Sequence, residues 1–283
     1  MQSGKASTTA MRVALHRAAH QLVDSPKILD DPLSLRIIGP DALQRLQAEP
    51  DDLQGRLARG LRAAMVVRSR FAEDELAAAV ASGVRQYVVL GAGLDTSAYR
   101  HPHRAKGLRV FEVDFPATQE WKRELLTQAG IAQPAELTFV PVDFENQTLA
   151  AQLRSAGFDP YAPAYFSWLG VTPYLTHDAF IKTLQYIAAG AQGTTVVFDY
   201  VLAPAALSLI EKTALDAMAQ RVALAGEPWR TTFVPAELAV KLRALGFTKA
   251  EDAGARFLNT RYCQDRADGL KVGNVVHLMK AVV

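Results

Sequence analysis

The chain has 283 residues, 49% of them hydrophobic and 21% charged, and its 31 basic residues nearly balance its 29 acidic ones. A formal net charge of +2 argues against the strongly basic surface that binds nucleic acids, so we expect no nucleic-acid partner. A single cysteine excludes an intrachain disulfide, and the lack of an apolar run of about 20 residues or of a signal-like N-terminus predicts a cytoplasmic protein without a membrane span.

The first part of the chain is predicted to be helical. Residues 7–23 alternate apolar and basic side chains at helical spacing, and the helix ends before Pro26. Asp41 is expected to be the N-cap of a further helix. Residues 53–82 contain no proline and are rich in Ala, Leu and Arg, which predicts two consecutive helices that stop at Gly83.

From residue 86 the chain alternates β-prone apolar runs with helical segments. The run at 87–90 is wholly apolar and stops at Gly91, as a buried parallel strand would. Strands that alternate with helices predict a parallel sheet with right-handed crossovers. The further predicted strands are residues 109–114, 138–143, 164–169 and 194–200, and the helices between them are residues 95–99, 117–129, 149–156 and 178–189.

After residue 200 the alternation lapses. Residues 203–226 are predicted to form one amphipathic helix, and residues 235–245 another. Residues 275–283 form a clear strand, with which residues 248–252 can pair antiparallel at one edge of the sheet. The whole predicts an α/β fold with a doubly wound, mostly parallel seven-stranded sheet. We expect an N-terminal helical cap over residues 1–83 and a core over residues 84–283, with a helical lid insertion at about 203–235.

Three features lie at the carboxyl ends of successive predicted strands, where open α/β sheets bind ligands. The turn Gly91-Ala92-Gly93 lets the backbone approach a ligand closely. Asp114 ends the second strand about 20 residues later, the spacing of an acid that accepts hydrogen bonds from a ribose diol. Asp143 and Phe144 follow the third strand and offer an acceptor for an exocyclic amine beside an apolar ring. Each feature alone has an ordinary structural interpretation, but the three together predict a nucleotide-like ligand.

The turn also indicates which nucleotide. Thr96 stands where a dinucleotide fingerprint has its third glycine, and the carboxylate of Asp95 would lie unfavourably close to a pyrophosphate. S-adenosylmethionine has no phosphate and carries an ammonium and a sulfonium, so an acidic turn suits it. Many nicotinamide oxidoreductases have a tyrosine that is followed four positions later by a lysine. None of the tyrosines in this chain is followed by a lysine at that spacing. An NAD(P)-dependent oxidoreductase therefore remains only as an alternative.

Several longer motifs occur in order along the chain: RSRFAEDEL at 68–76, QYVVLGAGLDTSAYR at 86–100, FEVDFP at 111–116, PVDF at 141–144 and WLGVTPYL at 168–175. In this order they resemble the leucine carboxyl methyltransferase family. The likeness is closest to the bacterial branch associated with O-methylation in polyketide-like secondary metabolism, and it fades over residues 203–255. It implies a class I methyltransferase core of the Rossmann-like type with S-adenosylmethionine as cofactor and S-adenosylhomocysteine as product.

The resemblance also implies roles for individual residues. Arg70 would bind the methionine carboxylate of the cofactor, because a guanidinium fork suits a carboxylate. Asp114 would hold the ribose, and Asp143 the adenine. Many relatives have Glu where this chain has Leu169, so Leu169 is expected only as a backbone or apolar neighbour. The residues expected at the cofactor are Arg70, Gly91, Ala92, Gly93, Asp95, Asp114, Phe115, Asp143, Phe144 and Leu169.

The acceptor side is less specified. Tyr174 is expected beside the cleft, although it can equally pack under a loop, and His177 is a weaker candidate for a base. The six histidines form no metal-ligand pattern, so no metal is expected. Helices that cover the cleft favour a small-molecule acceptor, and the lack of a clear base favours a carboxylate or an acidic hydroxyl, methylated by in-line displacement. A cofactor-binding protein that no longer transfers methyl groups is a further alternative, and the oligomeric state is left open.

Overall fold

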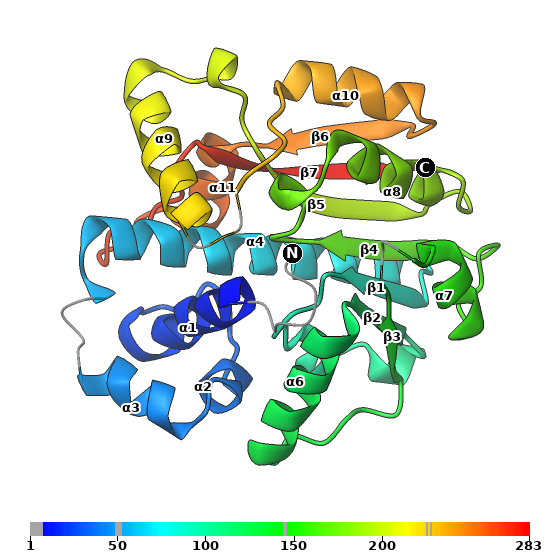
Figure 1. The fold of residues 1–283 in the computed structure, drawn as a ribbon, viewed down its shortest axis with the longest axis horizontal. Helices are drawn as coiled ribbons and strands as arrows, with labels where there is room; N and C mark the ends of the chain where they lie inside the picture. The colour runs from blue at the N-terminus through cyan, green and yellow to red at the C-terminus, as the bar shows by residue number, and fades with distance from the viewer. Residues whose placement is uncertain (1–7, 49–52, 144–145, 225, 227) are drawn as a thin grey trace.

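A seven-stranded sheet forms the centre of the computed structural model, which describes residues 8–48, 53–143, 146–224, 226 and 228–283 (Figure 1). The strand order is β3-β2-β1-β4-β5-β7-β6, in which β1 to β5 run parallel and β7 is antiparallel to both of its neighbours. The predicted fold class is confirmed, including the antiparallel pair at one edge. The strands are β1 Gln86–Leu90, β2 Arg109–Asp114, β3 Leu137–Pro141, β4 Ala164–Trp168, β5 Thr195–Val201, β6 Lys249–Ala253 and β7 Val276–Val282.

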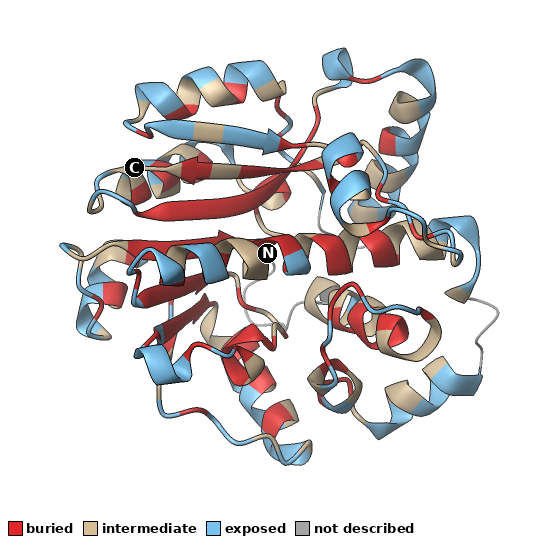
Figure 2. Ribbon diagram, turned by 180° about the vertical axis from the view of Figure 1, so that it is seen from behind, coloured by how far each residue is buried: buried red, intermediate tan, exposed pale blue. Residues whose placement is uncertain are grey.

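The central strands are buried on both faces, as Figure 2 shows. In β1, Tyr87 and Val89 belong to one hydrophobic cluster and Val88 and Leu90 to another, because successive side chains point to opposite faces of the sheet. The first cluster includes side chains of α1, α4, α5, α6 and α11, and the second includes those of α7, α8, α9 and α10. Two-sided burial explains why these strands read as continuous apolar runs.

Helices and short 3₁₀ turns surround the sheet. The helices are α1 Thr8–Val23, α2 Leu33–Ile37, α3 Pro40–Ala48, α4 Arg56–Ala81, α5 Ser97–Arg100, α6 Pro116–Gln128, α7 Leu149–Ser155, α8 His177–Ala188, α9 Leu209–Leu224, α10 Pro235–Ala244 and α11 Ala255–Tyr262. The 3₁₀ turns are η2 Arg104–Lys106, η3 Thr172–Tyr174 and η4 Pro204–Ala206.

The long α4 corrects the prediction of two helices over residues 53–82. Gly60 destabilises the helix by only about 1 kcal/mol relative to Ala. Along the helix, side chains such as Val66, Phe71 and Leu76 are buried, and this burial outweighs the glycine. α4 packs against α1 on one side and against β4 and β5 on the other.

Other boundaries also differ from the predictions. Pro40 is the first residue of α3, so Asp41 lies in the first turn, where its charge still favours the helix N-terminus, rather than at the N-cap. The predicted helix over residues 203–226 is divided into η4 and α9. Ser208 and Glu211 explain the division, because each side chain accepts a backbone N–H of the other in a capping box that starts α9. α11 was not predicted.

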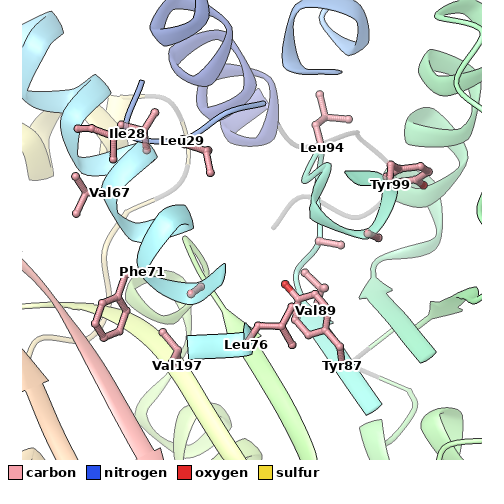
Figure 3. Packing of buried hydrophobic residues seen from close by; sticks show 14 of the residues in the cluster. Ile28, Leu29, Val67, Phe71, Leu76, Tyr87, Val89, Leu94, Tyr99 and Val197 are labelled. Carbon is pink, nitrogen blue, oxygen red and sulfur yellow. The ribbon is translucent and has the colours of Figure 1, made fainter. Parts of the chain in front are cut away.

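The N-terminal helices α1 to α3 lie together beside α4, away from the β6 edge of the sheet (Figure 1). Figure 3 shows Val67 and Phe71 of α4 on one side of the shared hydrophobic cluster, and Leu94 and Tyr99 of the turn after β1 and of α5 on the other. One core therefore joins the helices to the sheet. The division of the chain at residue 83 and the lid role of residues 203–235 stay predictions.

Candidate functional site

The turn after β1 is tightly enclosed. The N–H groups of Gly91 and Ala92 both donate to the carbonyl of Val113, at 2.8 and 3.1 Å. Gly91 and Gly93 have φ angles of 67° and 46°, which favour glycine. A Cβ atom on Gly91 would lie 2.3 Å from a methyl carbon of Val171. The chain therefore needs glycine at this position for conformation and for space.

Gly91→Ala is expected to destabilise the protein more than Gly107→Ala, a matched control. Gly107 has a similar φ of 72° but no neighbour within 4 Å of an added Cβ, so its substitution adds backbone strain alone. At Gly91 the new methyl also meets Val171, whose branched side chain is stiff at χ1, and overpacking of this kind costs about 1–3 kcal/mol more. Urea unfolding of both variants measures the difference, and equal free energies of unfolding would contradict it.

Asp114 at the end of β2 faces the turn. Its carboxylate accepts the N–H of Gly93 at 2.6 Å and the N–H of Phe115 at 2.7 Å. Burial raises the pKa of Asp114, although these two N–H groups and the ammonium of Lys122 act in the opposite direction. The structure thus brings together the glycine turn and the carboxylate predicted to hold a ribose. Phe115 is half-buried beside them, before the first residue of α6.

Asp95 is engaged with protein groups. Its carboxylate accepts the N–H of Ser97 at 2.7 Å and lies 3.3 Å from the guanidinium of Arg17 on α1, which also donates to the carbonyl of Leu94. Burial alone would raise the pKa of Asp95, but Arg17, Lys122 and other partners hold it below its ordinary value. This carboxylate links α1 to the turn. The role that we expect for Asp95 at the cofactor is therefore to hold the turn in shape.

Arg70 pairs with an acidic residue of its own helix, and its expected contact with the methionine carboxylate stays a prediction. Its side chain is 47% exposed, and its Nε lies 2.7 Å from Asp74, one helical turn further along α4. Asp74 in turn binds Arg261 and Tyr262 of α11. The spacing of Arg70 and Asp74, opposite charges four residues apart, was the signal in the sequence for a surface pair.

Arg68 is the arginine that reaches the carboxyl ends of the strands. Its guanidinium lies 2.8 Å from Asp199 of β5, with side-chain exposures of only 12% and 3%. Asp199 also accepts the N–H of Gly170, and a Cβ atom on Gly170 would lie 2.8 Å from the guanidinium of Arg68. Residues two apart on a helix point about 200° apart, so Arg68 and Arg70 lie on nearly opposite faces of α4.

The remaining cofactor candidates lie at the ends of β3 and β4. Asp143 is half-buried after β3, next to β2, and its carboxylate accepts the side-chain amide of Asn146 at 2.8 Å. Leu169 follows β4 and packs against the first hydrophobic cluster, and its place beside the cofactor stays a prediction. Phe144 lies outside the described residues.

The two acceptor-side candidates belong to different elements. Tyr174 ends η3, which is anchored by a hydrogen bond from Thr172 to the carbonyl of Asp199, and it is half-buried. His177 is the exposed first residue of α8, and its Nε2 lies 2.8 Å from the ammonium of Lys241 on α10. The structure therefore places His177 at the start of a helix, facing α10.

Two searches of the described residues bear on other functions. In that part of the chain, no three His, Cys, Asp or Glu side chains gather as the ligands of a metal ion would. No helix there has the length and apolar character to cross a membrane.

The chain is similar in sequence to known proteins. Residues 10–188, more than half of the chain, match the family model of leucine carboxyl methyltransferases. YktD of Bacillus subtilis (strain 168), named as an inferred S-adenosyl-L-methionine-dependent methyltransferase, is 29% identical over 100% of this chain and 99% of its own length. A Mycobacterium avium (strain 104) protein with the same inferred activity is 36% identical over 68% of this chain and 65% of its own length.

Solved structures support the fold. A methyltransferase inferred in Thermobifida fusca YX matches with a TM-score of 0.57 and 16% identity over 95% of this chain and 93% of its own. A DUF574-family protein of Streptomyces avermitilis MA-4680 matches with a TM-score of 0.57 and 17% identity over 88% of this chain and 96% of its own. The family match and the fold agree with the predictions from the motifs, and the chain belongs to the leucine carboxyl methyltransferase family.

Proposed function

We propose that this chain transfers the methyl group of S-adenosylmethionine to an oxygen atom of a small molecule, either a carboxylate or an acidic hydroxyl. The observation that carries the proposal is the carboxylate of Asp114, held 2.6 Å from the N–H of Gly93 at the end of β2. Family membership and the names of the relatives support S-adenosylmethionine as the methyl donor.

The residues at this edge of the sheet fit that cofactor. Asp114 accepts two backbone N–H groups, and its oxygens keep lone pairs that can accept ribose hydroxyls. Gly91 and Gly93 place no side chains on the turn. Arg68 offers a guanidinium for the methionine carboxylate, and Asp143 an acceptor for the adenine amine. We therefore assign to Arg68 the contact that the motif suggested for Arg70.

His16 on α1 is a poor candidate for a base. Burial, together with the charges of Arg62, Arg68 and Arg221, lowers its pKa to about 4. An imidazole with this pKa is neutral near pH 7 and is a weak base. A carboxylate acceptor is already ionised at that pH and needs no base, so it is favoured over a neutral hydroxyl, which would need one.

When bound, S-adenosylmethionine supplies a methyl group on a positively charged sulfur, which an acceptor oxygen can attack in line. The work of the chain is then to orient the two partners and to exclude water. α1 covers the turn closely, because a Cβ on Gly93 would lie 3.0 Å from that of Ala10. The small-molecule acceptor, the secondary-metabolic role and the cytoplasmic location are parts of this proposal.

A thermal-shift experiment tests the cofactor. At about 100 times its dissociation constant, a ligand adds about 2.7 kcal/mol of stability, which for a chain of this size raises the melting temperature by about 5 °C. We expect this rise with S-adenosylmethionine and S-adenosylhomocysteine and no rise with NAD or NADP. A rise with NAD alone would favour the oxidoreductase instead.

Transfer itself is tested with radiolabelled S-adenosylmethionine and a panel of aromatic and aliphatic carboxylic acids, phenols and enols. Label that enters an acceptor as a base-labile ester identifies a carboxylate, and a base-stable product identifies a hydroxyl. Cofactor binding without transfer to any member of the panel would favour the cofactor-binding protein that lacks activity.

A further inference from the structure

A buried ion pair lies behind the glycine turn. Glu112 and Asp114 are two residues apart on β2, so their side chains point to the same face of the sheet. Lys122 of α6 lies with its ammonium 2.6 Å from Glu112, and each of the two side chains is 1% exposed. The same ammonium lies 5.4 Å from the centre of the Tyr99 ring on α5. One cation thus joins β2, α6 and α5 around the turn.

This ion pair is poorly explained as a source of stability. The second carboxylate oxygen of Glu112 and the hydroxyl of Tyr99 are both buried without a hydrogen-bond partner in the described part of the chain. Burial raises the pKa of Glu112 to about 7, although Lys122 acts against the rise. Buried ion pairs can often be replaced by uncharged groups of similar volume without loss of stability. Stability alone therefore does not explain this ion pair.

A second role for the ion pair concerns the neighbouring carboxylate of Asp114. Asp114 is buried, which favours its protonated form, and Lys122 is the cation that opposes this effect. Two further charged side chains act near Lys122: its partner Glu112, and Asp95 of the turn, which pairs with Arg17 of α1. Both are acidic and disfavour a further negative charge. A ribose-binding carboxylate must be ionised to accept hydrogen bonds with both oxygens.

We propose that Lys122 is a positioning residue of the cofactor site: its ammonium, paired with Glu112 and packed on the ring of Tyr99, is the buried cation on the face of β2 that carries Asp114. The proposal rests on the ribose contact proposed for Asp114. Lys122 acts through Asp114 and through the placement of Tyr99, without contact to the cofactor.

The test is calorimetric titration of S-adenosylhomocysteine into the protein from pH 5.5 to 9. Lys122→Met is compared with the wild type and with Lys182→Met, which changes an exposed lysine of α8. The double variant Glu112→Gln/Lys122→Met removes both charges, so it separates the field of Lys122 from the cost of an unpaired buried carboxylate. Melting temperatures are measured alongside.

Without Lys122, the pKa of Asp114 rises. Because binding needs the ionised carboxylate, lowering the pH should remove the affinity of the variant at a higher pH than in the wild type. We expect the affinity of Lys122→Met to fall, as the pH is lowered, at a pH about one unit higher than that of the wild type, and the two proteins to bind alike at the alkaline end of the range. The double variant loses the acidic Glu112 together with Lys122, so it should regain stability and shift by less than Lys122→Met, and Lys182→Met should match the wild type.

Two results overturn the proposal. One is a pH profile of Lys122→Met that coincides with the wild type, and the other is a loss of affinity that is equal at every pH, which indicates a structural role alone. A wild type that fails to bind S-adenosylhomocysteine would overturn the proposed function as well, so the two failures are distinguishable.

Discussion

Asp114→Asn is expected to weaken S-adenosylhomocysteine binding by about 100-fold or more. The amide keeps the shape of the side chain but replaces one acceptor oxygen with a donor, which would face either the N–H of Gly93 or a ribose hydroxyl. Hydrogen bonds to a charged group contribute about 1.5–3 kcal/mol each, and the loss of two corresponds to at least two powers of ten in affinity.

The measurement is calorimetric titration, with Glu120→Gln as the control, because Glu120 lies exposed on α6 and its substitution removes a negative charge without touching the turn. The melting temperature of the unliganded variant shows whether the turn is intact. A folded Asp114→Asn protein whose dissociation constant lies within threefold of the wild type would remove Asp114 from the cofactor site.

Substitutions at Arg68 and Arg70 are expected to differ sharply in effect. Arg68→Lys keeps a positive charge beside Asp199 but lacks the planar fork that binds a carboxylate through two hydrogen bonds, so affinity for S-adenosylhomocysteine should fall by about 10- to 100-fold. Arg68→Gln goes further and leaves the buried Asp199 without its counter-charge, which costs about 3–5 kcal/mol in stability.

Arg70→Gln is the matched control, on the same helix and two residues away. It removes an exposed pair with Asp74, which is worth about 0.3–0.5 kcal/mol, and a long hydrogen bond to the carbonyl of Ile28, and affinity should be unchanged. Comparison of Arg68→Lys with Arg70→Gln by the same titration avoids the stability loss of Arg68→Gln. A weakened Arg70→Gln beside a normal Arg68→Lys would restore the role that the motif suggested for Arg70.

Strands were predicted more accurately than helices. β1, β4 and β5 are short, mostly apolar runs that are buried along their whole length, β1 is followed directly by Gly91, and β2 ends in Asp114, and this pattern is local in the sequence. Helix boundaries depended on more distant contacts. α4 stays continuous through Gly60 because it packs between α1 and the sheet, and α9 starts at Ser208–Glu211, where capping competes with continuation.

In the candidate site too, the residues that depend on local sequence were predicted and those that depend on distant contacts were not. The glycine turn comes directly after β1, and Asp114 is the last residue of β2. The parallel sheet brings the ends of these neighbouring strands together. The role of Asp95 depended on whether its carboxylate meets a ligand or Arg17, which is 78 residues away in sequence. Contacts over such a separation leave no spacing that a single sequence reveals.

By itself, the sequence determined the sheet, the glycine turn, the acid at the end of β2 and the family, because each depends on local pattern or on motifs in order. Only the tertiary structure decided which of two arginines on α4 faces the strands, since a rotation of about 100° per residue separates them and packing selects the face. It alone also paired Glu112 with Lys122 and Arg68 with Asp199. Burial decides such pairs, because a charge removed from water must find its partner wherever the fold supplies one.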